Sequence, residues 1–167
     1  MTSAEPTTST TAGWRHSRRT LAAVTVALAA VALVVDPIAR HMLSGGRTID
    51  LGPMELRLTY NTGVAFSLGD QLPTIVVLAV TAAITATIAV FAWRTAPNNH
   101  PIQTVGLAAI VAGAAANAID RTLDGKVTDY FHTGWFATFN LADTYITCGV
   151  ALVIGALLLE TGKDHTP

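Results

Sequence analysis

Long apolar segments dominate the pattern of hydrophobic and polar positions along the chain. They lie at residues 21–35, 72–93, 102–119 and 141–159. The hydrocarbon core of a bilayer is about 30 Å thick, a distance that roughly 20 residues of helix can span. Three of the segments have this length, and residues 36–43 can extend the first segment into the membrane interface. The pattern therefore predicts an all-α membrane protein with four transmembrane helices.

The two loops on one side of these helices carry a different pattern. In the first loop, apolar side chains alternate with polar ones from Met54 to Tyr60, which is the period of a β-strand. The second loop has short β-prone pieces around the turn signals Asp124-Gly125 and Thr133-Gly134. We expect the two loops to form a small β-sheet at the extracytoplasmic surface; amphipathic loops without regular structure are the alternative.

Composition agrees with a membrane domain. The chain is 51% hydrophobic and 13% charged, whereas a soluble domain has about 25% charged residues. The net charge of −1 gives no basic surface for nucleic acid. We expect residues 1–18 to form a disordered cytoplasmic tail, residues 19–160 the membrane domain and residues 161–167 a short cytoplasmic tail.

Basic residues suggest how the helices are oriented. Arg15, Arg18 and Arg19 precede the first apolar segment. The first segment carries most weight in the positive-inside rule, so both termini are expected in the cytoplasm. This segment could also be a cleaved secretory signal, but Asp36-Pro37 follows it in place of a small-x-small cleavage site. We therefore expect an uncleaved helix.

Acidic residues gather at the predicted outer membrane face. Asn117, Asp120 and Arg121 have positions i, i+3 and i+4, and so share one face at the end of the third helix. Asn140 and Asp143 are also three residues apart, at the start of the fourth. Ionisable groups near a membrane interior are costly and tend to be functional.

Structural roles would also explain these residues. Asn140 could be an N-cap, and Asp143 could favour the positive end of the helix. Asp120 and Arg121 could form an ion pair within their helix. From the residues alone, the cluster suggests a site without naming its chemistry.

Other chemistries have less support in the sequence. Cys148 has no histidine near it, and the five histidines are scattered without an HExxH motif, so no metal or other cofactor is expected. An ion-coupled carrier would place its charges near the middle of the helices, whereas these acids lie at one end.

Four motifs resemble those of the lipoprotein signal peptidase (signal peptidase II) family in the same order. They are "NTGVAF" at residues 61–66, "NAIDR" at 117–121, "VTDYF" at 127–131 and "FNLAD" at 139–143. The family consists of intramembrane aspartyl proteases of the bacterial plasma membrane. The resemblance implies removal of signal peptides from diacylglyceryl-modified prolipoproteins, just before the lipidated cysteine. The implied partners are these prolipoproteins and membrane lipids, and we expect a monomer.

The same resemblance implies roles for individual residues. Asp129 and Asp143 match the catalytic pair. The residues that match substrate-binding or site-supporting positions are Asn61, Asn117, Asp120, Arg121, Asn140 and Asp36. Ala116 stands where the family usually has glycine, and Pro37 and Arg40 stand where it usually has a polar residue and a lysine. A catalytically impaired member that acts as a membrane binding or assembly protein is therefore the alternative.

Peptide hydrolysis without a metal or a covalent nucleophile requires both a base and an acid. Two carboxyl groups a few Å apart cannot easily both ionise, so they share one proton. Because Asp143 is expected at the positive end of a helix, we predict that it is the charged base and that Asp129 is the protonated partner.

Overall fold

The structure is a computed structural model, and it describes residues 9–62 and 73–163. Its long helices are α1 (Ser9–Met42), α2 (Thr74–Thr95), α3 (Pro101–Asp124) and α4 (Leu141–Lys163). All four are long and apolar enough to cross a membrane. The sequence-based prediction of four transmembrane helices in a mostly helical protein is therefore confirmed.

The first helix begins earlier than expected. Residues 9–18 belong to α1, so this part of the predicted disordered tail is helical instead. Residues 1–8 lie outside the described part of the chain. At its other end α1 continues through Pro37 to Met42, which places residues 36–42 on the same helix as the apolar segment before them.

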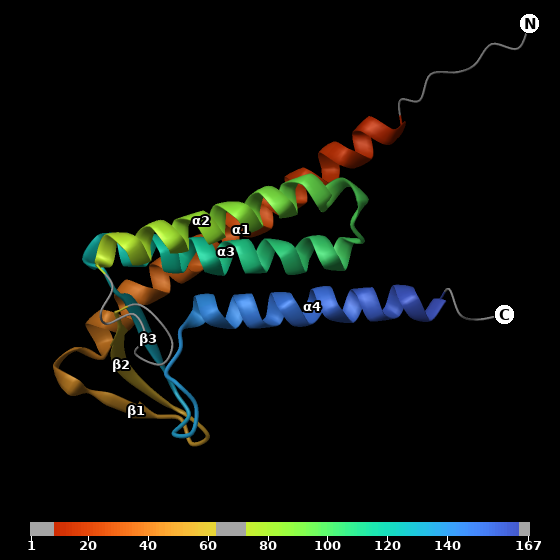
Figure 1. The fold of residues 1–167 in the computed structure, drawn as a ribbon. Helices are drawn as coiled ribbons and strands as arrows, with labels where there is room; N and C mark the ends of the chain where they lie inside the picture. The colour runs from red at the N-terminus through yellow and green to blue at the C-terminus, as the bar shows by residue number, and fades with distance from the viewer. Residues whose placement is uncertain (1–8, 63–72, 164–167) are drawn as a thin grey trace, which may run out of the picture.

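The central helix of the bundle is α3, which packs against α1, α2 and α4. The buried core on one side of it joins Leu107, Ala108 and Val111 of α3 with Leu21 of α1 and Ala92 of α2. In Figure 1, α4 lies along the opposite side of α3 from α2. The bundle is thus organised around one largely buried helix.

Glycine allows α3 and α4 to approach closely. A Cβ atom on Gly149 of α4 would lie 2.5 Å from the carbonyl oxygen of Gly106 of α3. A Cβ atom on Gly113 would clash with the carbonyl oxygen of Ala142, the second residue of α4. Small residues at helix interfaces let backbones pack closely in membranes. The start of α4 is therefore held directly against α3.

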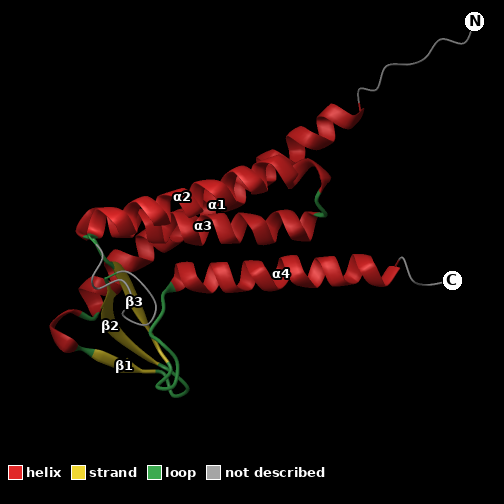
Figure 2. Ribbon diagram, viewed as in Figure 1, coloured by secondary structure: helices red, strands yellow, loops and turns green. Residues whose placement is uncertain are grey.

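A small antiparallel sheet lies at one end of the bundle (Figure 2). Its strands are β1 (Thr48–Asp50), β2 (Glu55–Asn61) and β3 (Val127–His132), in the order β1-β2-β3. Short 3₁₀ helices, η1 (Ser44–Gly46) and η3 (Ala96–Asn98), lie in the connections after α1 and α2. The first two strands come from the loop after α1 and the third from the loop before α4, so the prediction that these two loops form a small sheet is confirmed.

The end of α3 leads directly into β3. Gly125 ends the helix with φ of 79°, a left-handed conformation that glycine adopts without steric cost, and its N–H binds the carbonyl of Arg121. β3 begins two residues later and pairs with β2, with Thr59 opposite Asp129 and Asn61 opposite Val127. The polar end of α3, strand β3 and the start of α4 therefore meet at one corner of the molecule.

Candidate active site

Asp129 and Asp143 lie on two different elements at this corner. Asp129 is in the middle of β3 and is only 3% exposed. Asp143 is in the first turn of α4. The two residues that match the family's catalytic pair therefore lie on a strand and at the N-terminus of a helix.

Asn140 connects the two aspartates. Its side chain is fully buried, and its Nδ2 donates to Asp129 Oδ1 at 3.1 Å and to Asn117 Oδ1 at 2.9 Å. Its Oδ1 accepts the backbone N–H of Asp143 at 2.9 Å, and Asp143 Oδ2 accepts the backbone N–H of Asn140 at 3.1 Å. This reciprocal pair has the pattern of a capping box, which satisfies N–H groups at the helix start. The side chain of Asn140 therefore both caps α4 and hydrogen-bonds to Asp129.

Two further asparagines complete the surroundings of the pair. Asn117 Nδ2, on α3, donates to Asp143 Oδ1 at 2.8 Å. The side chain of Asn61, the last residue of β2, hydrogen-bonds to Asp129. The structure thus brings all three asparagines singled out in the sequence to the aspartates. Residues 63–66, the rest of the first motif, lie outside the described residues.

The electrostatic environment favours a proton on Asp129. Burial, and then the nearby carboxylate of Asp143, raise the pKa of Asp129 from 3.8 to about 7. Hydrogen bonds from Asn61 and Asn140, and the positive charge of Arg121, offset part of this rise. A carboxyl group with such a pKa can hold a proton near neutral pH.

Asp120 pairs with a residue other than the one anticipated. Its carboxylate forms an ion pair with Arg40 of α1 and not, among the described residues, with Arg121 next to it. Asp120 Oδ2 also accepts the backbone N–H of Thr128 at 2.8 Å, and Arg40 Nε donates to Thr128 Oγ1 at 2.6 Å. The Asp120–Arg40 pair therefore holds the residue that precedes Asp129 on β3.

Arg121 lies near the two aspartates and forms no ion pair within the described residues. Its guanidinium is close enough to Asp129, Asp120 and Asp143 to interact with their charges. Its Nη1 is 3.5 Å from Thr81 Oγ1 of α2, and its Nε is buried without a hydrogen-bond partner among the described residues. The guanidinium thus supplies a positive field at the site.

Asp36 belongs to a separate contact. It is 2% exposed, and its Oδ1 accepts a hydrogen bond from the hydroxyl of Tyr130 at 3.2 Å. Asp36 is therefore connected to the site by its hydrogen bond with Tyr130, the residue that follows Asp129 on β3.

Sequence reasoning missed Arg40, Thr128 and Tyr130 as parts of this network. Arg40 is four residues after Asp36 on the same helix, a spacing that places both on one face and could have drawn attention to it. Thr128 and Tyr130 lie inside the motif at residues 127–131, but strand pairing decides where their side chains point.

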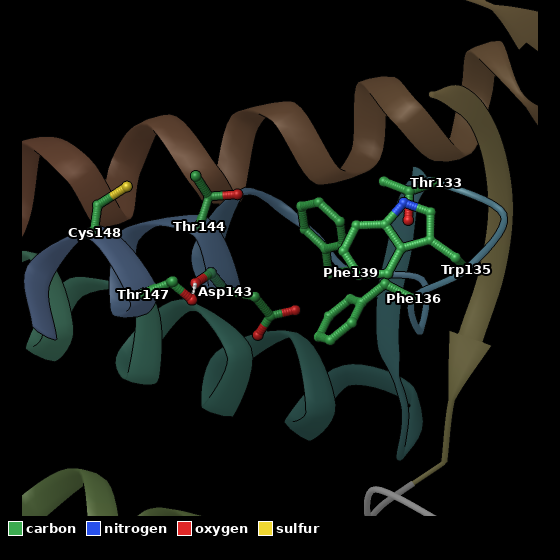
Figure 3. A pocket seen from close by; sticks show the side chains of 8 residues that line it. All are labelled: Thr133, Trp135, Phe136, Phe139, Asp143, Thr144, Thr147 and Cys148. Carbon is green, nitrogen blue, oxygen red and sulfur yellow. Dashed lines mark hydrogen bonds between the residues drawn. The ribbon is translucent and has the colours of Figure 1, made fainter. Parts of the chain in front are cut away.

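A pocket of about 360 Å³ opens beside Asp143. Its lining residues are Thr133, Trp135, Phe136, Phe139, Asp143, Thr144, Thr147 and Cys148. Figure 3 shows the three aromatic side chains grouped on one side of Asp143, with Thr147 and Cys148 on the other. Trp135 is 84% exposed and Phe136 58%. A carboxylate thus borders a mainly apolar pocket with exposed aromatic walls.

The fold and site define a multi-pass membrane protein with a buried acid, Asp129, beside a partly buried acid, Asp143, at one end of its helices. The signal peptidase (SPase) II family matches residues 21–159, and the chain belongs to that family. It is therefore a peptidase of bacterial membranes.

Relatives of known description agree with this assignment. The chain is 39% identical over 136 residues to the lipoprotein signal peptidase of Mesorhizobium japonicum, covering 76% of this chain and 80% of the relative. It is 38% identical over 145 residues to that of Sinorhizobium fredii, covering 81% and 87%.

Two solved structures share the fold. Both are described as bacterial membrane enzymes studied by the in meso method, and both are 24% identical to this chain. The first has a TM-score of 0.69 and covers 86% of this chain and 92% of the other; the second has 0.65 and covers 80% and 92%.

Proposed function

We propose that this protein is an aspartyl endopeptidase that removes signal peptides from diacylglyceryl-modified prolipoproteins, cleaving before the lipidated cysteine. The substrate class follows from the lipoprotein signal peptidases to which the chain is similar. The observation that carries the catalytic type is the connection of Asp129 and Asp143 through Asn140, with the pKa of Asp129 raised to about 7.

The two aspartates would divide the acid and base roles. Asp143, beside the N–H groups at the start of α4, acts as the ionised base and takes a proton from water as the water oxygen attacks the scissile carbonyl carbon. Asp129, as the neutral acid, gives its proton to the carbonyl oxygen, so a gem-diol forms.

Collapse of the gem-diol then restores the pair. As the carbon–nitrogen bond breaks, Asp143 returns its proton to the leaving nitrogen, and a gem-diol hydroxyl returns a proton to Asp129. One water is consumed, and both carboxyl groups end in their starting states. The pair titrates as a unit, so pKa values measured by kinetics belong to both residues.

The remaining polar residues have supporting roles in this proposal. Asn61, Asn117 and Asn140 hold the carboxyl groups, and Arg121 balances their charge. Asp120 and Asp36 act through Thr128 and Tyr130 on the strand that carries Asp129. Both aspartates and all these partners come from one chain, which supports a monomer as the active unit.

The pocket beside Asp143 supports a lipid-bearing substrate. Its walls are aromatic or small side chains, and it lies at the end of membrane-length helices. We expect it to hold the apolar part of the substrate next to the scissile bond, and membrane lipid when substrate is absent.

Basic residues support cytoplasmic termini and an extracytoplasmic site. Arg15 and Arg19 are exposed near the start of α1, at the end of the bundle opposite the sheet (Figure 1). Labelling intact cells with a membrane-impermeant thiol reagent tests this orientation in a Cys148→Ser background. A Ser44→Cys variant should react from outside and an Asn98→Cys variant only after permeabilisation; the reverse pattern would overturn the orientation.

A gel-shift cleavage assay tests the proposed function. The purified protein is incubated with a diacylglyceryl-modified prolipoprotein, and wild type is compared with Asp129→Asn and Asp143→Asn. Asp50→Asn, which changes an exposed acid on β1, is the matched control. We expect cleavage by wild type and Asp50→Asn and at least 1,000-fold slower cleavage, to order of magnitude, by the other two.

Other results would replace the proposal. Cleavage that survives either substitution would refute the aspartyl pair. A folded wild type that does not cleave would favour a binding or assembly role, and uptake of an ion into vesicles would favour a carrier.

A further inference from the structure

The hydroxyl of Tyr130 lies between two groups that the proposed mechanism does not use directly. It donates to Asp36 Oδ1 at 3.2 Å and accepts the backbone N–H of Leu141 at 3.1 Å. Tyr130 and Asp36 are each 2% exposed, so water does not readily replace either bond. Burial raises the pKa of Tyr130 well above its usual range, which keeps the hydroxyl protonated and able to donate.

These two bonds join three elements. Asp36 is on α1, Tyr130 is on β3 directly after Asp129, and Leu141 is the first residue of α4. The first N–H groups of a helix have no partner within the helix, so the hydroxyl satisfies a group that would otherwise be unpaired. Leu141 is two residues before Asp143, and the hydroxyl thus bridges the segments that carry the two aspartates.

The backbone at this point is secured independently. The N–H of Tyr130 donates to the carbonyl of Phe139 at 3.0 Å, and Phe131 and Phe139 exchange two backbone hydrogen bonds, of 2.8 and 3.1 Å. Loss of the hydroxyl alone would therefore leave β3 attached to the segment before α4. Without the hydroxyl, however, the start of α4 would no longer be held in a fixed position relative to β3.

We propose that Tyr130 is a positioning residue, whose hydroxyl sets the separation of Asp129 and Asp143 by tying the start of α4 to β3 and to Asp36. This inference rests on the proposed function, because it assigns the hydroxyl a role in aligning the aspartyl pair. It also gives buried Asp36 a role: to orient the Tyr130 hydroxyl so that its lone pair faces the N–H of Leu141.

Tyr130→Phe removes the hydroxyl and little else. Misalignment of reacting groups by about 1 Å can cost about 100-fold in rate, so we expect kcat to fall about 10- to 100-fold. KM should stay within about twofold, because the pocket residues are unchanged. The alkaline limb of the pH–rate profile should move to lower pH, since aspartates that are farther apart and better hydrated hold their shared proton less tightly.

Tyr145→Phe is the matched control. Tyr145 is a half-buried tyrosine of α4 whose hydroxyl makes no hydrogen bond within the described residues, so this variant should keep the wild-type kcat and pH profile. In a double-mutant cycle, Asp36→Ala and Tyr130→Phe should be less than additive in kcat, because both break the same contact.

The experiment distinguishes failure of the Tyr130 role from failure of the proposed function. The inference is overturned if Tyr130→Phe matches Tyr145→Phe, or if its activity falls only as much as its folded fraction with the pH profile unchanged. If Asp129→Asn or Asp143→Asn stays active in the same assay, the proposed function itself fails. Loss of activity in those two variants with normal Tyr130→Phe kinetics removes this inference alone.

Discussion

Asn140 Nδ2 donates to Asp129 Oδ1 at 3.1 Å while Asn140 Oδ1 accepts the backbone N–H of Asp143. One amide side chain thus serves both as the N-cap of α4 and as the connection between the aspartates. The conformation of Asn140 that caps α4 therefore also places its amide N–H group beside Asp129.

Asn140→Ala should lose both functions. Removal of an N-cap costs about 1 kcal/mol of stability, and the unpaired donors and acceptors left behind add to this. We expect a lower Tm and a fall of about 100-fold or more in kcat, because Asp129 loses a fixed partner. Thermal unfolding and the gel-shift assay measure the two effects. Asn98→Ala, an exposed asparagine of η3, should match wild type in both. A kcat within twofold of wild type in Asn140→Ala would contradict this role.

The rate of cleavage should depend on pH near neutrality. In the proposed mechanism the reaction needs a proton on Asp129, whose pKa is raised to about 7 by burial and by Asp143. We therefore expect kcat/KM to fall above about pH 7, whereas an ordinary aspartic acid would lose its proton near pH 4. A profile from pH 4 to 9, at constant ionic strength and with Tm recorded at each pH, checks this. Constant kcat/KM up to pH 9 would show that the pair does not lose its shared proton there.

Asp129→Asn should become more stable relative to wild type as pH rises. The carboxyl group has a pKa of 3.8 in the unfolded chain and about 7 in the folded protein, so the folded state binds the proton more tightly. Its contribution to stability is therefore complete at low pH and declines as pH rises from about 4 to 7. Asparagine does not ionise and avoids this loss. The Tm of the variant relative to wild type should increase by about 3 °C or more between pH 4 and pH 8, measured by thermal unfolding. A Tm difference between variant and wild type that does not change with pH would mean that folding does not raise the pKa of Asp129.

The helices were predictable because their signal is strong and local. Runs of about 20 apolar residues have few explanations besides a membrane span, and α2, α3 and α4 lie within a few residues of the predicted segments. The period-two pattern from Met54 to Tyr60 likewise identified β2. The start of α1 was less predictable, because residues 9–18 are polar and their helix has no hydrophobic signal of its own.

The residues around the aspartates were only partly predictable. Those in spaced polar motifs, such as Asn117 and Asn140, were found because their types are unusual near a membrane. The Asp120–Arg40 pair was not, because the two residues are 80 positions apart and local spacing favoured the neighbouring Arg121 instead. Tyr130 was ambiguous for another reason, since an aromatic residue near the membrane surface is usually an interfacial anchor. Long-range packing decides such contacts.

Close packing of α3 on α4 should affect the site at a distance. A methyl group on Gly113 would clash with the carbonyl of Ala142, next to Asp143, and would lie 2.8 Å from Ile146 Cγ1. Gly113→Ala should therefore cost about 1–3 kcal/mol and lower kcat by moving the start of α4. Gly155→Ala is the control, because nothing lies within 4 Å of its added methyl group. Thermal unfolding and cleavage rates of both variants test this. Equal behaviour of the two would show that the α3–α4 contact can relax without consequence.

The pocket beside Asp143 should determine substrate affinity more than rate. Cys148 lines it, and its thiol is exposed and free. Cys148→Trp would fill part of the pocket without burying new surface in the protein core. Loss of roughly 60 Å² of apolar contact between substrate and pocket would cost about 1.5 kcal/mol of binding free energy. We therefore expect KM for the lipid-modified precursor to rise about tenfold or more.

Two control variants separate pocket filling from other effects of the Cys148→Trp substitution. Cys148→Ser keeps the size of the side chain and should leave KM within about twofold of wild type. Val150→Trp places the same bulk on an exposed position of α4 that does not line the pocket, and should also have the wild-type KM. Steady-state cleavage of the lipid-modified precursor by the three variants gives the answer. A KM that rises equally in Cys148→Trp and Val150→Trp would mean that bulk on α4 disturbs the helix in the membrane and that the pocket does not hold the apolar part of the substrate.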